Sequence, residues 1–318
     1  MLTNASGGGA AVVLGAVVIF LLTFFLLKNP LPFLPRDHGR AYAVDGELSK
    51  GKLRGVGVVF IPVFILGSLA FLPFDMEYAA YMALLFFMML FGYLDDAAKL
   101  PWSDYKKGAL DFLLSLLTMA TFVYFNPTVV SVGSAVIALP KAVYFILGVI
   151  LLWGSVNVTN CADGVDGLCG SVSALVFAAF ALGVPQAAEG YALYRDAGVL
   201  LIAALLAYLL FNAKPSSMLM GDAGSRAIGY MIAVVAMKSG HPFLFLPFAL
   251  VFILDGGLGL AKIFLKRFFK ISIFVNTRMP LHDHFRKQRG WSDTQIVLRY
   301  CALQIFFSAL GYLTVTLL

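Results

Sequence analysis

Long runs of apolar residues, separated by short polar segments, cover most of the 318-residue chain. A helix needs about 20 predominantly apolar residues to cross a bilayer, and many of the runs approach that length. They predict ten transmembrane helices, at about 10–27, 55–72, 77–94, 109–125, 141–159, 168–184, 195–211, 225–238, 243–265 and 296–317. The pattern therefore predicts an all-α polytopic membrane protein.

The composition agrees with this prediction and excludes an ordinary soluble domain. Hydrophobic residues make up 61% of the chain and charged residues only 13%, whereas soluble domains are about 25% charged. No Lys or Arg precedes the first run, which favours a first span over a signal peptide. We expect residues 1–318 to form a single integral-membrane domain, without a nucleic-acid partner.

The basic residues are distributed unequally across this topology. All but three of the 23 Lys and Arg residues fall on one side, the exceptions being Lys141, Arg195 and Lys238. Basic residues accumulate on the cytoplasmic side of a membrane, so we predict that this side is cytoplasmic and that both termini face outward. Most acidic residues share the same side. Such a mixed face suits an anionic ligand held with a metal better than a simple anchor to acidic lipids.

One polar stretch, Asn157 to Leu168, places two carboxylates and two carboxamides between apolar runs. Burying an unpaired carboxylate in hydrocarbon costs roughly 3 kcal/mol on insertion scales. Asp163 and Asp166 therefore need a compensating partner. Solvent, a cation or a substrate would each serve.

Two further acidic segments lie on the predicted cytoplasmic side. Asp95 and Asp96 end the third run, where two acids oppose the helix dipole unless a metal or a cationic neighbour offsets them. Lys99 follows Asp95 by four residues, close enough to pair on one helix face. Asp222 lies between glycines just before the eighth run. Several carboxylates from different spans are thus expected to converge.

The remaining polar segments supply cations and imidazoles. Lys50, Lys52 and the neighbouring glycines are suited to wrapping a phosphate, although positive charge that only fixes topology is an equal interpretation. His282 and His284 are suited to a metal, to a phosphate or to acid/base chemistry, and two surface histidines fit equally well. Asp255 lies inside the ninth run, where a hydrogen bond to a neighbouring helix is at least as good an interpretation, and is not assigned to the site.

These groups together predict phosphoryl transfer at the membrane surface. Mg²⁺ usually takes one or two protein carboxylates and fills its other positions with water and substrate phosphate. Phosphoryl transfer also needs cations for the phosphates and a carboxylate for the nucleophile. An ion-coupled transporter or lipid flippase is the alternative from another class. It would place ionisable residues near mid-bilayer, whereas apart from Asp255 the acids lie at span ends.

The chain resembles the polyprenyl-phosphate N-acetylhexosamine-1-phosphate transferases in its spans and loop order. The resemblance rests on four segments: Leu94 to Lys99, Asn157 to Leu168, Phe211 to Ser225, and Pro280 to Trp291. It implies transfer of phospho-MurNAc-pentapeptide from UDP-MurNAc-pentapeptide to undecaprenyl phosphate, giving lipid I for peptidoglycan and UMP, with Mg²⁺ as cofactor. It places the protein in the bacterial plasma membrane, with a cytoplasmic active site. A sister reaction with UDP-GlcNAc is the alternative, and a homodimer is compatible with the sequence.

The resemblance also assigns residues. It implies catalytic roles for Asp95, Asp96, Asp222, His282 and His284, and Mg²⁺ binding by Asp222 with Asp96 or Asp163. It implies substrate binding by Lys50, Lys52, Lys99, Lys106, Lys107, Asn157, Asn160, Asp163, Gly164, Asp166 and Asn212. The resemblance leaves open the choice between Lys50 and Lys52. It matches Lys107 to a nucleotide-contacting lysine, with Lys106 as the alternative if the alignment shifts by one residue. The expected mechanism is a direct displacement in which Asp95 deprotonates or orients the lipid phosphate, and a two-step route through a phospho-aspartate also fits.

Three positions depart from the family pattern. The family's three consecutive histidines become two, with Asp283 between them, and an aromatic residue that could stack on uracil is replaced by Leu219. The glycine-rich motif expected after the first span is absent, and Gly51 to Gly57 takes its place. These departures concern ligand contacts. The acidic segments, in contrast, match the family pattern.

Overall fold

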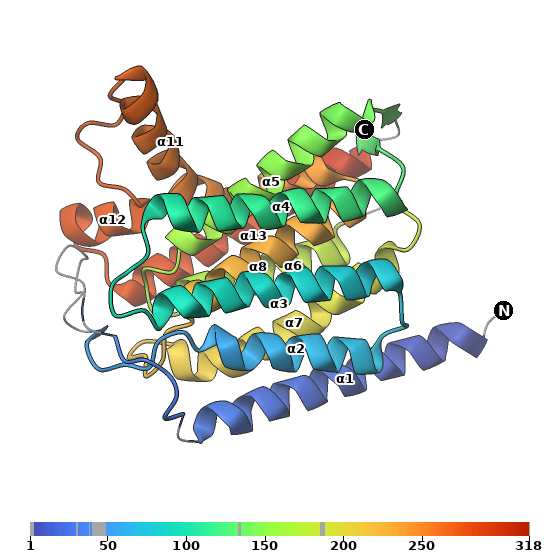
Figure 1. Cartoon of the computed structure of the whole chain (residues 1–318), viewed down its shortest axis with the longest axis horizontal. Helices are drawn as coiled ribbons and strands as arrows, with labels where there is room; N and C mark the ends of the chain where they lie inside the picture. The colour runs from blue at the N-terminus through green and yellow to red at the C-terminus, as the bar shows by residue number, and fades with distance from the viewer. Residues whose placement is uncertain are drawn as a thin grey trace.

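The computed structural model describes residues 3–29, 31–37, 39, 49–132, 135–184 and 188–317. Nine of the ten predicted spans are continuous helices: α1 (Thr3–Lys28), α2 (Gly57–Phe71), α3 (Met76–Asp96), α4 (Asp104–Phe125), α5 (Lys141–Cys161), α6 (Leu168–Leu182), α7 (Tyr191–Asn212), α8 (Gly221–Lys238) and α13 (Asp293–Leu317). They pack side by side as one bundle (Figure 1). The prediction of an all-α polytopic membrane protein is confirmed.

Length and apolarity alone identify fewer crossings than ten. Within the described residues, α1, α3, α4, α5, α7 and α13 are long and apolar enough to span a membrane, and one bent pair raises six candidates to seven. The other runs form shorter or more polar helices, because α2 and α6 have only 15 residues each and α8 carries three charges. The chain is therefore a multi-pass membrane protein, and the count of ten stays a prediction.

The ninth predicted span is not one straight helix. It consists of η2 (Pro242–Leu244), α9 (Phe245–Phe248), α10 (Leu250–Phe252), the π-helical η3 (Ile253–Gly257), α11 (Leu258–Phe264) and the π-helical η4 (Leu265–Phe269). Its two parts, 242–248 and 250–269, meet at 68°. Pro247 removes a backbone donor and two glycines follow in η3, which explains the break. As a result α11 leans away from the bundle (Figure 1).

Two short elements were not predicted. β1 (Val129–Val132) pairs antiparallel with β2 (Ala135–Ala138) between α4 and α5. α12 (Leu281–Arg289) lies within the polar segment between the ninth and tenth predicted spans. The pattern missed both because neither contains a long apolar run. α12 carries both candidate histidines, His282 and His284.

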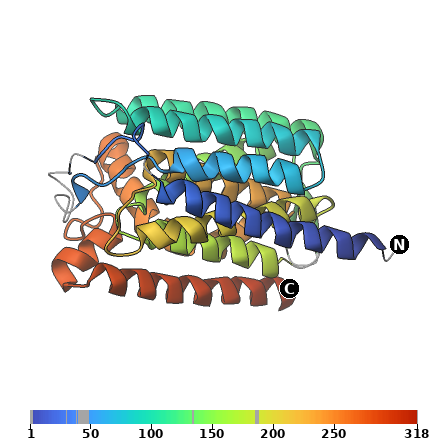
Figure 2. The same ribbon diagram turned by 90° about the horizontal axis from the view of Figure 1, so that it is seen from below.

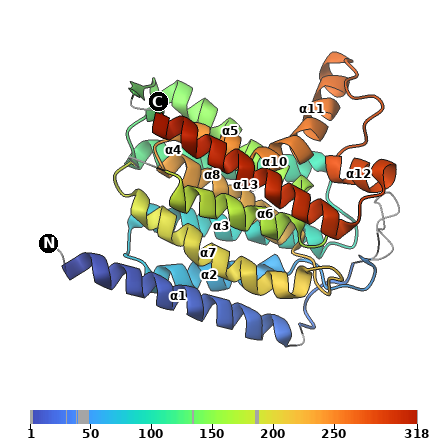
Figure 3. The ribbon, with the colours of Figure 1, turned by 180° about the vertical axis from the view of Figure 1, so that it is seen from behind.

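α8 is the central helix of the bundle. All 18 of its residues are buried, and it packs against α2, α3, α5, α6 and α7, as its position in Figure 3 shows. Close packing requires glycine: a Cβ on Gly92 of α3 would collide with the backbone of Asp222, and one on Gly57 of α2 with that of Gly224. Small residues at helix contacts let backbones approach in this way. The sequence thus brings the ends of α3 and α8 together.

The two ends of the bundle differ. The start of α1 and the end of α13 lie at the same end (Figure 2). The opposite end collects α12 and the polar segments that follow α3, α5 and α7 (Figure 1). The acidic segments predicted to converge all lie at this loop end. Which end faces the cytoplasm stays a prediction from the basic residues.

Candidate active site

Three aspartates from two helices meet at the loop end. Asp95 and Asp96 end α3, Asp222 lies in the first turn of α8, and all three are buried. Asp96 Oδ2 accepts a hydrogen bond of 3.0 Å from the backbone N–H of Ala223. A helix N-terminus carries partial positive charge, so α8 offsets the unfavourable position of two acids at the C-terminus of α3.

Lys107 joins two of these carboxylates. Its ammonium forms ion pairs with Asp95 and with Asp222 Oδ2, the second at 3.4 Å. The side chain of Lys106 is exposed and its ammonium lies over the ring of Trp102. Of Lys107 and its alternative Lys106, the structure places Lys107 in the carboxylate cluster.

The pair between Lys99 and Asp95 suggested by their spacing does not form. A pair four residues apart needs a continuous helix, and α3 ends at Asp96. Lys99 lies beyond this end and is exposed. Lys107 of α4 is the lysine that pairs with Asp95.

Two arginines balance the remaining charge. Arg54 Nε donates to Asp96 Oδ1 at 2.8 Å. Arg226 reaches two carboxylates, with 2.9 Å from Nη2 to Asp222 Oδ2 and 3.1 Å from Nη1 to Asp111 Oδ1. Arg226 and Asp111 are almost fully buried. A buried ionic chain therefore runs from Asp111 through Arg226 to Asp222, and it supports the carboxylate cluster through Asp222.

The sequence interpretation assigned no role to Asp111 or Arg226. Helical spacing was the available signal, because Arg226 follows Asp222 by four residues and Asp111 follows Lys107 by four. A buried charge without a partner is costly. Each of these two apolar helices carries an acid and a base one turn apart. This spacing therefore indicated a shared network of buried ion pairs.

The surroundings of Asp222 keep its side chain ionised. Burial alone raises the pKa of this carboxyl. The positive charges of Arg226 and Lys107, and a hydrogen bond of 3.1 Å from Asn160, outweigh burial and lower the pKa below its usual range. Asp222 is consequently a carboxylate at neutral pH, the form that binds a cation.

The segment from Asn157 to Leu168 forms one wall of the site. Asn160 Nδ2 donates to Asp222 Oδ1 at 3.1 Å and to the hydroxyl of Ser225 at 2.9 Å. The amide of Asn157 instead donates to the carbonyl of Trp153 in its own helix, at 2.8 Å. Of the two carboxamides, Asn160 is thus the one in contact with the cluster.

Lys52 completes this wall. Its ammonium lies 3.1 Å from Asp166 Oδ2 and 2.7 Å from the hydroxyl of Ser216. Asp166 also accepts a hydrogen bond of 3.2 Å from the backbone N–H of Ser216. Lys50 is exposed. The structure therefore places Lys52 in this wall, and its role in substrate binding stays a prediction.

Asn212 holds two loops together. Its Oδ1 accepts from the backbone N–H of Gly167 at 2.9 Å, and its Nδ2 donates to the carbonyl of Met218 at 2.7 Å. The side chain is only 3% exposed. Its amide is occupied by these two contacts, so the structure gives Asn212 a positioning function in the wall.

His282 is anchored by Asp255, the residue that the sequence interpretation set aside. Asp255 Oδ1 accepts from the backbone N–H of His282 at 2.8 Å and from the hydroxyl of Tyr300 at 2.9 Å, and its Oδ2 lies 2.7 Å from Nδ1 of the imidazole. The other ring nitrogen faces Gly164, where an added Cβ would collide with it. His282 therefore connects α12 to the wall of the site.

The rest of the histidine segment lies farther out. α12 separates His282 from His284, whose side chain is partly exposed and whose Nδ1 lies 3.4 Å from the backbone N–H of Arg278. Asp283, in the place of the family's middle histidine, contacts Arg278 Nε at 3.5 Å. The two histidines thus have different surroundings, as expected for residues two apart on a helix.

The site contains carboxylate oxygens, the type of ligand that a magnesium ion prefers. Two carboxylates, Asp95 and Asp222, lie around the single ammonium of Lys107, and Mg²⁺ prefers carboxylate oxygens, one or two from the protein. Among the described residues, no three His, Cys, Asp or Glu side chains form a ready metal cluster. Binding by Asp222 together with Asp96 or Asp163 therefore stays a prediction.

Comparison with known proteins gives consistent similarities. Residues 78–240 match the model of glycosyl transferase family 4. The phospho-N-acetylmuramoyl-pentapeptide-transferase of Treponema pallidum strain Nichols is 39% identical over 316 residues, covering 93% of this chain and 85% of that protein. The enzyme of the same name from Bacillus subtilis strain 168 is 29% identical over 304 residues, covering 88% of this chain and 90% of that protein.

Proposed function

This chain belongs to glycosyl transferase family 4, and we propose that it transfers phospho-MurNAc-pentapeptide from UDP-MurNAc-pentapeptide to undecaprenyl phosphate. The products would be lipid I, used for peptidoglycan, and UMP. The observation that carries the proposal is the convergence of Asp95, Asp96 and Asp222 with Lys107 at one end of an apolar bundle. A water-soluble donor and a lipid acceptor can meet there.

The charges of the site suggest a direct displacement. Asp95 would accept a proton from the acceptor phosphate or orient it, while Lys107 and Arg54 supply positive charge beside the phosphates. An acceptor oxygen then bonds to the β-phosphorus of the donor, the bond from this phosphorus to the bridging oxygen breaks, and UMP leaves. Mg²⁺ bound at Asp222 would neutralise diphosphate charge.

The bacterial relatives support a location in the bacterial plasma membrane. The predominance of Lys and Arg at the loop end supports a cytoplasmic active site. UDP-MurNAc-pentapeptide would then reach the protein from the cytoplasm, and undecaprenyl phosphate from the bilayer. A homodimer is a further proposal, which the mass of the detergent-solubilised protein would decide.

A donor comparison tests the proposed reaction. Purified protein in detergent, given undecaprenyl phosphate and Mg²⁺, should release UMP from UDP-MurNAc-pentapeptide and not from UDP-GlcNAc. UMP release is measured for both donors, with and without EDTA. Release only from UDP-GlcNAc would support the sister reaction instead, and no release from either donor would reject the transferase.

Asp255→Asn tests the anchoring of His282. An amide keeps the size of the side chain but replaces the acceptor at Nδ1 with a group that can donate, so the imidazole loses its fixed tautomer. We expect kcat for UMP release to fall about 10-fold to 100-fold with little change in KM for the donor.

Tyr300→Phe is the matched control, because it removes another hydrogen bond to the same carboxylate without altering its contact with the imidazole. It should retain most of the activity. Equal losses in both variants, in parallel with equal losses of thermal stability, would show that Asp255 serves folding alone.

A further inference from the structure

A side chain of α13 fills the break in the ninth predicted span. In a continuous α-helix the N–H of Val251 would donate to the carbonyl oxygen of Pro247, four residues earlier. At the break, both groups pair with the carboxamide of Gln304. Its Oε1 accepts from the Val251 N–H at 3.2 Å, and its Nε2 donates to the Pro247 carbonyl oxygen at 3.3 Å. A side chain inserted between such groups is one cause of sharp helix bends, so Gln304 takes the place of a backbone hydrogen bond.

The carboxamide of Gln304 is fully buried. Its Nε2 also donates to the carbonyl oxygen of Phe248 at 2.8 Å and to the hydroxyl of Ser308 at 2.9 Å. Backbone groups freed by a helix break are costly inside a membrane unless a neighbouring helix satisfies them. Pro247 explains why the helix can break, and Gln304 fixes both sides of the break to α13.

The bend held in this way determines where Asp255 lies. One helical turn separates Val251 from Asp255. Tyr300, which donates to Asp255 Oδ1 at 2.9 Å, precedes Gln304 by four residues on α13 and therefore lies on the same face of that helix. A single face of α13 thus holds both the break and the carboxylate that anchors His282.

η3 fits closely against α5. A Cβ added to Gly256 would lie 2.6 Å from the Cβ of Cys161 and 2.8 Å from the carbonyl oxygen of Val158. A contact this close leaves little room for a second position of η3. A different bend would therefore separate η3 from α5 or shift the carboxylate of Asp255.

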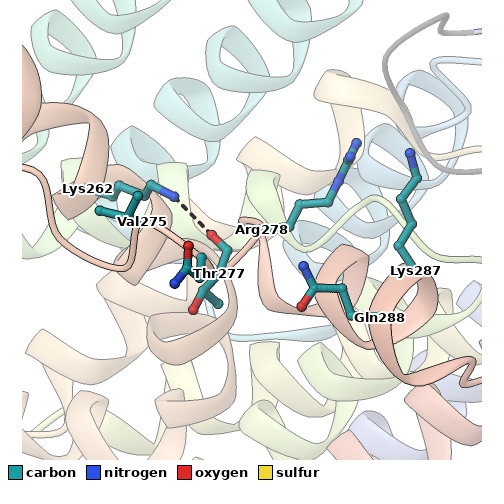
Figure 4. Close-up of a pocket in the computed structure, with 7 residues that line it drawn as sticks. Lys262, Val275, Thr277, Arg278, Lys287 and Gln288 are labelled. Atoms are coloured by element: carbon teal, nitrogen blue, oxygen red, sulfur yellow. Dashed lines mark hydrogen bonds between the residues drawn. The ribbon is translucent and has the colours of Figure 1, made fainter.

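The part of the span beyond the break also carries α12. Asp255 holds the backbone N–H and the ring of His282. Farther along, Lys262 of α11 donates to the carbonyl oxygen of Thr277 at 2.9 Å (Figure 4), which fastens the segment that leads into α12. With two such attachments, α12 follows the direction of the bent span. Loss of the bend would move His282 away from Gly164 in the wall of the site.

We propose that Gln304 is a positioning residue of the transferase, because it holds the bend at which Asp255 reaches His282. The inference rests on the proposed function and extends it to a residue of α13 that lies outside the carboxylate cluster. Gln304 would act through Asp255 and His282, since its own hydrogen bonds go to the break and to Ser308. A residue that served stability alone would not be coupled to Asp255 in the reaction.

Gln304→Met tests this coupling, because Met keeps the length of the side chain but has no amide. We expect kcat for UMP release to fall about tenfold, with little change in KM for the donor, because His282 is misplaced. Added to Asp255→Asn, the same change should lower kcat by less than about twofold more, since both act on one contact. Ser308→Ala is the matched control: it removes another partner of the Gln304 amide but leaves the break satisfied.

Hydrogen exchange followed by mass spectrometry tests the break without any reaction. Backbone amides of residues 249–253 should exchange about tenfold faster in Gln304→Met than in wild type, because the Val251 N–H loses its acceptor. Exchange in Ser308→Ala should match wild type. Should Gln304→Met fail to fold, Gln304→Asn carries both measurements, because its shorter side chain cannot reach the break.

Three outcomes would overturn the assignment. Unchanged exchange in Gln304→Met would show that Gln304 does not hold the break, and faster exchange with normal kcat would show that the bend does not position the site. Losses of kcat that multiply fully with those of Asp255→Asn would show that Gln304 acts independently of Asp255. If wild-type protein released no UMP, the proposed function would fail, while the exchange measurement would still decide whether Gln304 holds the break.

Discussion

Asp222→Asn should reduce UMP release by about three orders of magnitude or more while the protein still folds. The amide keeps the size of the side chain and can still accept from Asn160, so packing around α8 is preserved. The lost negative charge removes the principal proposed ligand of Mg²⁺. A metal contributes several kcal/mol to such reactions, and each 1.36 kcal/mol is tenfold in rate.

Asp104→Asn is the control for this variant. Asp104 is an exposed acid at the start of α4, on the same side of the protein, and its replacement should leave UMP release within about twofold of wild type. Both variants are compared by UMP release over a range of Mg²⁺ concentrations and by thermal unfolding in detergent. Near-normal activity of Asp222→Asn would refute its role at the metal.

The largest effect on stability is expected from Arg226→Met. This change leaves the buried carboxylates of Asp111 and Asp222 without their shared cation. Removing one partner of a buried ion pair costs about 3–5 kcal/mol. The apparent melting temperature in detergent should fall markedly, and UMP release should fall with it because Asp222 loses its position.

A second substitution shows whether uncompensated charge is the cause. Adding Asp111→Asn to Arg226→Met removes one of the two carboxylate charges that lost this cation and should recover part of the lost stability. Arg195→Met serves as the control, because Arg195 is an exposed residue that pairs with the adjacent Asp196 and should matter little. A double variant no more stable than Arg226→Met would contradict the charge explanation.

The hydrophobic pattern failed where the chain departs from regular helices. It described residues 243–265 as one span, whereas the structure breaks this region and places Asp255 in the π-helical η3. A run of apolar residues indicates burial but not how the backbone is hydrogen-bonded. The pattern therefore cannot predict a π-helical turn. The alternative interpretation of Asp255, a hydrogen bond to a neighbouring helix, agrees with its contacts to His282 of α12 and Tyr300 of α13.

Motif reasoning matched Lys107 with Lys106 as its alternative, and left the choice between Lys50 and Lys52 open. Lys106 and Lys107 are adjacent, and only one glycine separates Lys50 from Lys52. Spacing alone therefore cannot say which side chain of each pair faces the site. The orientation of α4, and that of the loop before α2, decides which lysine of each pair faces the site. Packing turns Lys107 toward Asp95 and Lys52 toward Asp166.

The sequence by itself determined that the protein is helical, membrane-embedded and acidic at several helix ends, because apolar runs and the cost of burying charge are local properties of the chain. Only the tertiary structure decided which charges neutralise one another. Asp111 and Arg226 are 115 residues apart along the chain, as are Lys107 and Asp222. Such pairs depend on how α3, α4 and α8 pack, and that packing depends on many contacts at once.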